Sequence, residues 1–145
     1  MERGVRSLSH SNGTYRVSKI GIRLDNYCKY EYPGFYSHSS MKAHQLLSSA
    51  ENWCKESPAK DSQGNKLQAF DPRAAKWCAL GAIQKTYPPV EWGEAMDQIL
   101  RALSYSDAGL AKMTKTDKAC CLMEWNDDYG SSFEEIRGIL LEVDI

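Results

Sequence analysis

The sequence predicts a mainly α protein (α+β), a compact bundle of five to six short helices with an N-terminal β-hairpin arm. Apolar residues recur at helical spacing over most of residues 39–145. One segment, residues 72–86, is apolar on nearly every side and predicts a central helix. Residues 15–24 alternate apolar and polar side chains, which is typical of a strand. We therefore divide the chain into a flexible start with a Tyr-rich hairpin arm (1–38) and a helical domain (39–145).

The arm is expected to contain two strands. Residues 15–24 alternate in character, Asp25-Asn26 favours a turn, and residues 27–32 can return as a second strand before Pro33-Gly34. A two-stranded hairpin is marginally stable by itself, so this arm must rest on the helical domain or on a partner.

The first helix is expected from about Ser39-Ser40 to Pro58, because its apolar residues follow an i, i+3, i+4, i+7 pattern. These residues are Ala43, Leu46, Leu47, Ala50, Trp53 and Cys54. The polar stretch 60–66 predicts a turn, which could be the tip of a short hairpin.

The central helix is expected to begin at Asp71-Pro72, an N-cap acceptor followed by a residue suited to the first helical position. Pro88-Pro89 ends it. Gly81 costs about 1 kcal/mol relative to Ala inside a helix, so its presence indicates a close approach by a neighbouring segment.

Four more elements follow. Helices are expected from about Val90 to Tyr105 and from Ser106-Asp107 to about Met113. Thr116 can cap a third helix that ends in the segment 125–130, and Ser131 with Glu134 has the spacing of a capping box for the last helix.

Composition and cysteine usage exclude several classes of protein. The net charge is −1, with six basic and three acidic residues in 1–40 (+3) and twelve basic and sixteen acidic residues in 41–145 (−4). This balance gives no bulk electrostatic reason to expect nucleic acid or a membrane surface as partner. Five cysteines without a C-x-x-C pair fit neither a disulfide framework nor a zinc site, so we expect no metal and no cofactor. Free thiols and the lack of an apolar leader or membrane span predict a cytoplasmic protein.

One combination of residues could support catalysis. Cys78 could act as a nucleophile with His44 as its base and Asp127 or Asn126 as the orienting group, as in a cysteine-dependent hydrolase or transferase. However, Cys78 is expected at least six residues inside its helix, away from the positive N-terminal dipole, and among alanines. We therefore favour a buried packing cysteine and assign no catalytic residue.

Two other groups of residues are candidates for structural or binding roles. Arg73 could form an internal clamp with Asn126 and Asp127, which would then support the turn after their helix. Tyrosine and arginine are enriched at binding hot spots, and the arm is rich in aromatic and basic side chains. Its candidate partner-binding residues are Tyr15, Arg16, Arg23, Tyr27, Lys29, Tyr30, Tyr32 and Tyr36.

The segment Cys78-Ala79-Leu80-Gly81-Ala82, followed later by Trp125-Asn126-Asp127 and a final helix, resembles a family of small uncharacterised bacterial and bacteriophage proteins. That family is a domain of unknown function with a C-A-L-G-A helix and a W-N-D segment. The resemblance covers roughly Met41 to Val143. It implies a shared α-rich fold and a bacterial or phage origin, and it brings no catalytic residues.

The function that we expect is a non-enzymatic protein-interaction module that displays the tyrosine-rich arm. In a bacterial cell or a phage-infected host it could be a phage-encoded accessory protein or an inhibitor of a host defence complex. A nucleic-acid partner is the weaker alternative, because the excess of basic charge in the arm is small.

Overall fold

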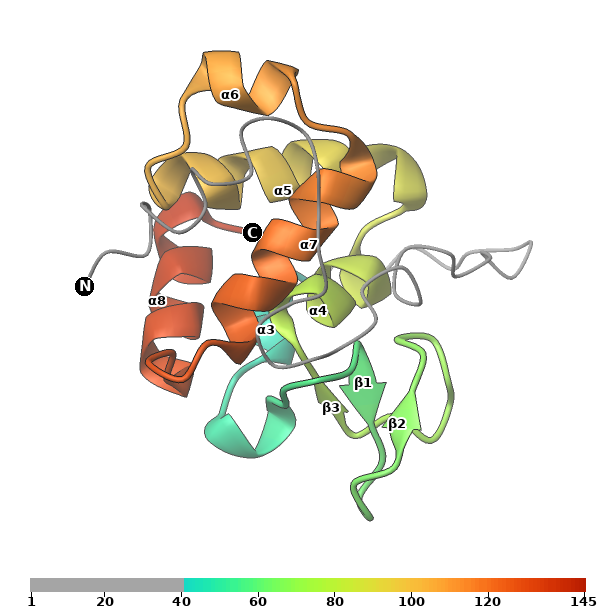
Figure 1. The fold of residues 1–145 in the computed structure, drawn as a ribbon. Coiled ribbons are helices and arrows are strands. Elements are labelled where there is room, and N and C mark those ends of the chain that lie inside the picture. Colours follow the sequence, from blue (N-terminus) through green and yellow to red (C-terminus); the bar gives the residue numbers. More distant parts are fainter. Residues whose placement is uncertain (1–40) are drawn as a thin grey trace.

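The structure is a computed structural model that describes residues 41–145. This part contains six α-helices, one 3₁₀ helix and three short strands (Figure 1). In chain order they are α3 (Ala43–Leu46), η1 (Ala50–Asn52), β1 (Ala59–Lys60), β2 (Lys66–Leu67), β3 (Lys76–Trp77), α4 (Ala79–Thr86), α5 (Pro89–Ala102), α6 (Asp107–Ala111), α7 (Lys115–Asp127) and α8 (Phe133–Val143). The mainly α prediction is confirmed. The expected arm lies outside the described residues.

Helix α4 is the centre of the fold. Every residue of α4 except Lys85 is buried, and the helix packs against α3, α5 and α7. Gly81 faces the backbone of Pro58 so closely that a Cβ atom there would lie 1.8 Å from the Pro58 carbonyl oxygen. The expected central apolar helix is therefore confirmed, and so is the reason for its glycine.

The start of this helix was wrongly predicted, since α4 begins at Ala79 and not at residue 72. Asp71 does act as a backbone acceptor, but its Oδ1 receives the N–H of Arg73 at 2.9 Å within a turn. The next residues then pair with β1, where Ala75 donates its N–H to the carbonyl of Lys60 at 2.8 Å. Asp71 therefore caps a turn that precedes β3 and does not start a helix. Residues 76–77 form a strand because they pair with β1.

The first helix is also much shorter than predicted. It ends after one turn at Leu46, and η1 follows before the chain becomes extended at Trp53. Trp53 forms a parallel bridge with Trp77, and Cys54 donates its N–H to the Trp77 carbonyl at 3.1 Å. These backbone hydrogen bonds to β3 replace the helical ones that the apolar periodicity of this segment predicted.

The three strands form an antiparallel sheet in the order β2-β1-β3. The expected hairpin tip lies between β1 and β2, where Asp61 accepts the N–H groups of Gln63 and Asn65. Gly64 has a φ of 89°, which glycine adopts without steric cost. In Figure 1 the sheet lies at the opposite end of the molecule from α5 and α6.

Helices α7 and α8 begin close to their expected positions but use different caps. Thr114, rather than Thr116, caps α7 and forms a reciprocal capping box with Asp117. Ser132, rather than Ser131, caps α8. The neighbouring Ser131 hydroxyl turns inward instead and donates to a carbonyl near the end of α7.

Replacing Gly81 by alanine should destabilise the protein strongly. The new Cβ would overlap the Pro58 backbone, which cannot move like the tip of a flexible side chain, so we expect a loss of roughly 3 kcal/mol or more in the free energy of unfolding. Gly138→Ala is the matched control, because Gly138 lies in α8 with open space around it. That variant should gain up to about 1 kcal/mol. Urea unfolding of both variants tests the packing, and equal stability of the two would contradict it.

Candidate functional site

Asn126, near the end of α7, connects more elements than any other candidate residue. Its side chain is fully buried. Its Oδ1 accepts hydrogen bonds from Trp53 Nε1 at 2.8 Å and from the Ala79 backbone N–H at 3.0 Å. Its Nδ2 donates to the Cys54 carbonyl at 3.1 Å and to Asp127 Oδ1 at 2.8 Å. One amide with both donors and both acceptor positions in use therefore ties α7 to the segment after η1 and to the start of α4.

Asp127 supports the same segment through a second contact. Its Oδ1 accepts the backbone N–H of Glu56 at 3.0 Å, and Glu56 has a positive φ of 70°. Burial raises the pKa of Asp127 above its ordinary value, whereas the hydrogen bonds from Asn126 and Glu56 act against that rise. The carboxylate thus stabilises a turn that a non-glycine residue rarely adopts.

Lys55 completes this cluster from the other side. Its Nζ donates to the carbonyls of Asp128 at 2.9 Å and Ser131 at 3.3 Å, and it lies 5.5 Å from the centre of the Trp53 ring. A positive charge is favourable there, because the C-terminal end of α7 carries the negative end of the helix dipole. Tyr129, at the corner between α7 and α8, is fully exposed.

The structure places Cys78 at the N-cap of α4 rather than inside a helix, which corrects its predicted position. Its Sγ accepts the N–H of Gly81 at 3.3 Å. The side chain is only 2% exposed, and burial raises the pKa of the Cys78 thiol well above its ordinary value. Burial likewise raises the pKa of nearby Cys54 to about 12. Both groups are therefore thiols, not thiolates, at neutral pH, although one of them lies at a helix N-terminus.

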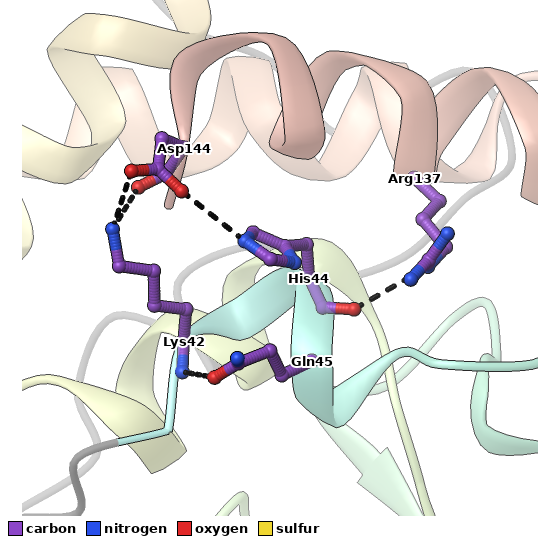
Figure 2. A network of polar contacts seen from close by, with 5 residues as sticks. All are labelled: Lys42, His44, Gln45, Arg137 and Asp144. Atoms are coloured by element: carbon purple, nitrogen blue, oxygen red, sulfur yellow. Dashed lines mark hydrogen bonds and ion pairs between the residues drawn. The ribbon is translucent and has the colours of Figure 1, made fainter.

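His44 lies on α3 and interacts with the end of α8 (Figure 2). Its Nε2 is 3.3 Å from Asp144 Oδ1, and its backbone N–H donates to the Ile145 carbonyl at 2.9 Å. Arg137 of α8 donates from Nε to the His44 carbonyl at 3.4 Å. The imidazole and its backbone thus hold the first described helix against the last one.

Lys42 strengthens the same junction, as Figure 2 shows. Its Nζ donates to Asp144 Oδ2 at 2.7 Å and to the Asp144 carbonyl at 2.9 Å. These contacts, with the one from His44, hold the pKa of Asp144 below its ordinary value. Asp144 has a left-handed backbone (φ 59°) at the C-cap of α8, so its side chain and carbonyl both turn toward α3.

The three residues of the candidate catalytic set are not brought together. Within residues 41–145, no hydrogen bond joins His44 to Cys78 or to Asp127. Arg73 also lies outside the cluster in which we expected it. It forms an ion pair with Asp71 at 2.8 Å and lowers the pKa of that carboxyl to about 2. Asn126 and Asp127 do form the expected structural cluster, but without Arg73.

The eight candidate partner-binding residues of the arm fall outside the described part of the chain. They are Tyr15, Arg16, Arg23, Tyr27, Lys29, Tyr30, Tyr32 and Tyr36.

Sequence reasoning missed the segment that Asn126 holds. Trp53, Lys55 and the Glu56 backbone all contact the end of α7, yet the apolar spacing placed this segment in an amphipathic helix. A signal was present in Glu56-Ser57-Pro58, since a residue before proline is disfavoured in helical conformation. That rule argues for an earlier end of the first helix than Pro58 itself.

Two further observations concern the described residues as a whole. No group of three or more histidine, cysteine or acidic side chains between residues 41 and 145 is arranged to hold a metal ion. In the same region, every helix is too short or too polar to cross a lipid bilayer.

The fold and site define an α-rich domain whose most buried polar cluster serves to hold its own elements together. The chain belongs to the family of unknown function DUF6197, whose model matches residues 41–143. This match confirms the expected membership in a family of unknown function and its extent along the chain. No curated protein and no solved structure matches the chain.

Replacing Asp127 by asparagine should leave the free energy of unfolding at pH 7 unchanged or raise it by up to about 0.5 kcal/mol. The asparagine Oδ1 keeps the acceptor position for Asn126 and Glu56 while the buried charge is removed. Because folding raises the pKa of Asp127, this residue favours the folded state at low pH and loses that contribution as the pH rises through the raised pKa.

The advantage of Asp127→Asn should therefore shrink as the pH falls from 7 toward the ordinary aspartate value of 3.8. Urea unfolding at pH 7 and pH 4 measures this difference. Glu142→Gln, which removes an exposed negative charge from α8, controls for net charge and should show no such trend. A loss of more than about 2 kcal/mol at pH 7 for Asp127→Asn would mean that the ionised carboxylate is required.

The buried thiols should resist alkylation in the folded protein. At neutral pH we expect iodoacetamide to label Cys54 and Cys78 at least a hundred-fold more slowly than in urea-unfolded protein, since the thiolate is the reactive form. Peptide mass spectrometry gives the rate for each cysteine. Labelling of native Cys78 as fast as in the unfolded chain would reveal an activated nucleophile.

Proposed function

We propose that this protein is a non-enzymatic protein-interaction module. One observation carries the proposal: the groups that could form a cysteine-dependent active site are each engaged in stabilising the fold. The Cys78 thiol caps α4 in a buried position, the His44 imidazole faces Asp144, and Asp127 supports the Glu56 turn. A hydrolase or transferase would need the thiol and the imidazole to meet where a substrate can enter.

We assign partner binding to the first 38 residues. Tyrosine and arginine contribute large contact areas and directed hydrogen bonds at interfaces, and this segment is rich in both. Its net charge of +3 is also opposite in sign to the net charge of −4 on residues 41–145. The two parts of the chain therefore differ in the chemistry that they offer to a partner.

Within this class, a bacterial or bacteriophage origin would make the protein a cytoplasmic accessory factor or an inhibitor of a host defence complex. The C-A-L-G-A and W-N-D resemblance described above supports the bacterial or bacteriophage origin. The free, buried cysteines of residues 41–145 support a reducing compartment such as the cytoplasm.

Affinity capture with the full-length chain as bait tests the proposal. A variant with Tyr27→Ala, Tyr30→Ala, Tyr32→Ala and Tyr36→Ala should retain at least ten-fold less of the partner than the unchanged protein, because hot-spot residues typically cost about 2 kcal/mol or more each. Quantitative mass spectrometry of the bound fraction from a bacterial lysate provides the measurement.

Two control variants distinguish binding through the arm from binding through the helical domain. Tyr129→Ala removes an exposed tyrosine outside the arm, and Cys78→Ala removes the candidate nucleophile; both should capture the partner as well as the unchanged chain does. Circular dichroism establishes that each variant is folded. Full capture by the four-tyrosine variant, or loss of capture by a folded Cys78→Ala variant, would overturn the proposal.

A further inference from the structure

The three-stranded sheet carries one lysine on each strand at the same register position. Lys60 on β1 lies opposite Lys66 on β2 and opposite Lys76 on β3. Directly opposed residues of antiparallel strands project on the same face of the sheet. The opposite face of the sheet points into the core, where Ala59, next to Lys60, and Trp77, next to Lys76, are both buried. We call Lys60, Lys66 and Lys76 the lysine row.

This arrangement is unfavourable for the protein by itself. Like charges directly opposite each other destabilise a sheet, and Lys60 has such a neighbour on both sides. Among the described residues, none of the three ammonium groups forms an ion pair. Two acidic residues near the row along the chain are engaged elsewhere, since Asp61 accepts hydrogen bonds within its turn and Asp71 pairs with Arg73.

The lysine row also belongs to a basic part of a mostly acidic body. Residues 55–76 contain five basic and three acidic side chains, a balance of +2. Residues 77–145 contain six basic and twelve acidic side chains, a balance of −6. The sheet therefore presents positive charge at one end of the molecule, while α5 and α6 lie at the other end (Figure 1).

We infer that the lysine row is a contact surface for a short acidic segment of a protein partner. The inference rests on the proposed function and names the chemistry of its partner. Opposed like charges on a sheet, with no compensating ion pair from residues 41–145, depart from a local stability rule, and such departures are typical of functional surfaces. Opposite charges supplied by a partner would relieve the repulsion among the three lysines and would also speed association.

The size and surroundings of the lysine row favour an acidic peptide over nucleic acid. Adjacent strands lie about 4.8 Å apart, so the row spans roughly 10 Å and fits the carboxylates of one short segment. The tryptophan of β3 lies in the core and offers no stacking surface beside the row.

Fluorescence anisotropy with the full-length protein tests this inference. The probe is a fluorescein-labelled peptide of eight glutamates, with an eight-glutamine peptide and a short DNA duplex of the same label as comparisons. At about 50 mM salt the glutamate peptide should bind, the glutamine peptide should not, and added salt should weaken the binding. Lys60→Gln should lower the affinity at least five-fold.

Lys112→Gln is the matched control, because Lys112 is an exposed lysine at the end of α6, outside the lysine row. It should change the affinity less than two-fold. Equal losses for the two variants would mean that only net charge matters and would overturn the inference. Tighter binding of the DNA duplex through Lys60 would also overturn it and would assign the surface to nucleic acid.

A second measurement, of thermal stability, tests whether the three lysines repel one another in the free protein. Lys60→Glu should create two attractive cross-strand pairs, raise Tm by about 2 °C and abolish binding of the glutamate peptide. Lys112→Glu should do neither. A lower Tm for folded Lys60→Glu would show that the lysines do not repel one another in the free protein and would remove the basis of the inference.

The two proposals fail separately. If Lys60→Glu captures the same partner as well as the unchanged chain, while the four-tyrosine variant does not, the lysine-row inference fails and the interaction module stands. If no partner is captured at all, the proposed function fails, whatever the peptide measurements give.

Discussion

The buried amide of Asn126 is the interaction on which the rest of this structure depends. It accepts from an indole and a backbone N–H and donates to a carbonyl and a carboxylate, so that three separate segments meet at one side chain. A buried amide left without partners would cost several kcal/mol, and this one has all of its positions filled. The start of α4, the extended segment after η1 and the end of α7 are consequently fixed relative to one another.

This arrangement has a consequence for chemistry. The polar side chains of Asn126 and Asp127 are already paired with backbone groups or with other side chains. The nearby thiols of Cys54 and Cys78 are buried and have raised pKa values. The same holds where α3 meets the end of α8, since the imidazole of His44 is turned toward Asp144. Groups that are held in this way stabilise the domain. On the sheet, by contrast, Lys60 lies opposite both Lys66 and Lys76, and no acidic side chain of residues 41–145 forms an ion pair with any of the three.

Much of the architecture could be predicted from the sequence, because it follows from local patterns. The apolar run with its glycine predicted the central helix, and the polar stretch 60–66 predicted the hairpin tip. The predicted helix boundaries are wrong where backbone groups form hydrogen bonds with a distant segment instead of within a helix. Asp71-Pro72 has the chemistry of a helix start, but β3 pairs with β1 immediately afterwards. Ala50, Trp53 and Cys54 have helical spacing, but the backbone of Cys54 bonds to Trp77. The candidate site was predicted in part: Asn126 and Asp127 were found, whereas Trp53, Lys55 and the turn at Glu56 were not.

The sequence by itself determined the fold class, the burial of the small-residue helix and the family, because composition, periodicity and motif spacing can be read along the chain without knowing which segments meet. Only the tertiary structure decided which distant groups meet. It placed Cys78 at a helix start without activating it, paired Arg73 with Asp71, and aligned Lys60 with Lys66 and Lys76. The physical reason is that strand register and buried hydrogen bonds depend on contacts between segments far apart in the chain, and local propensity carries no information about them.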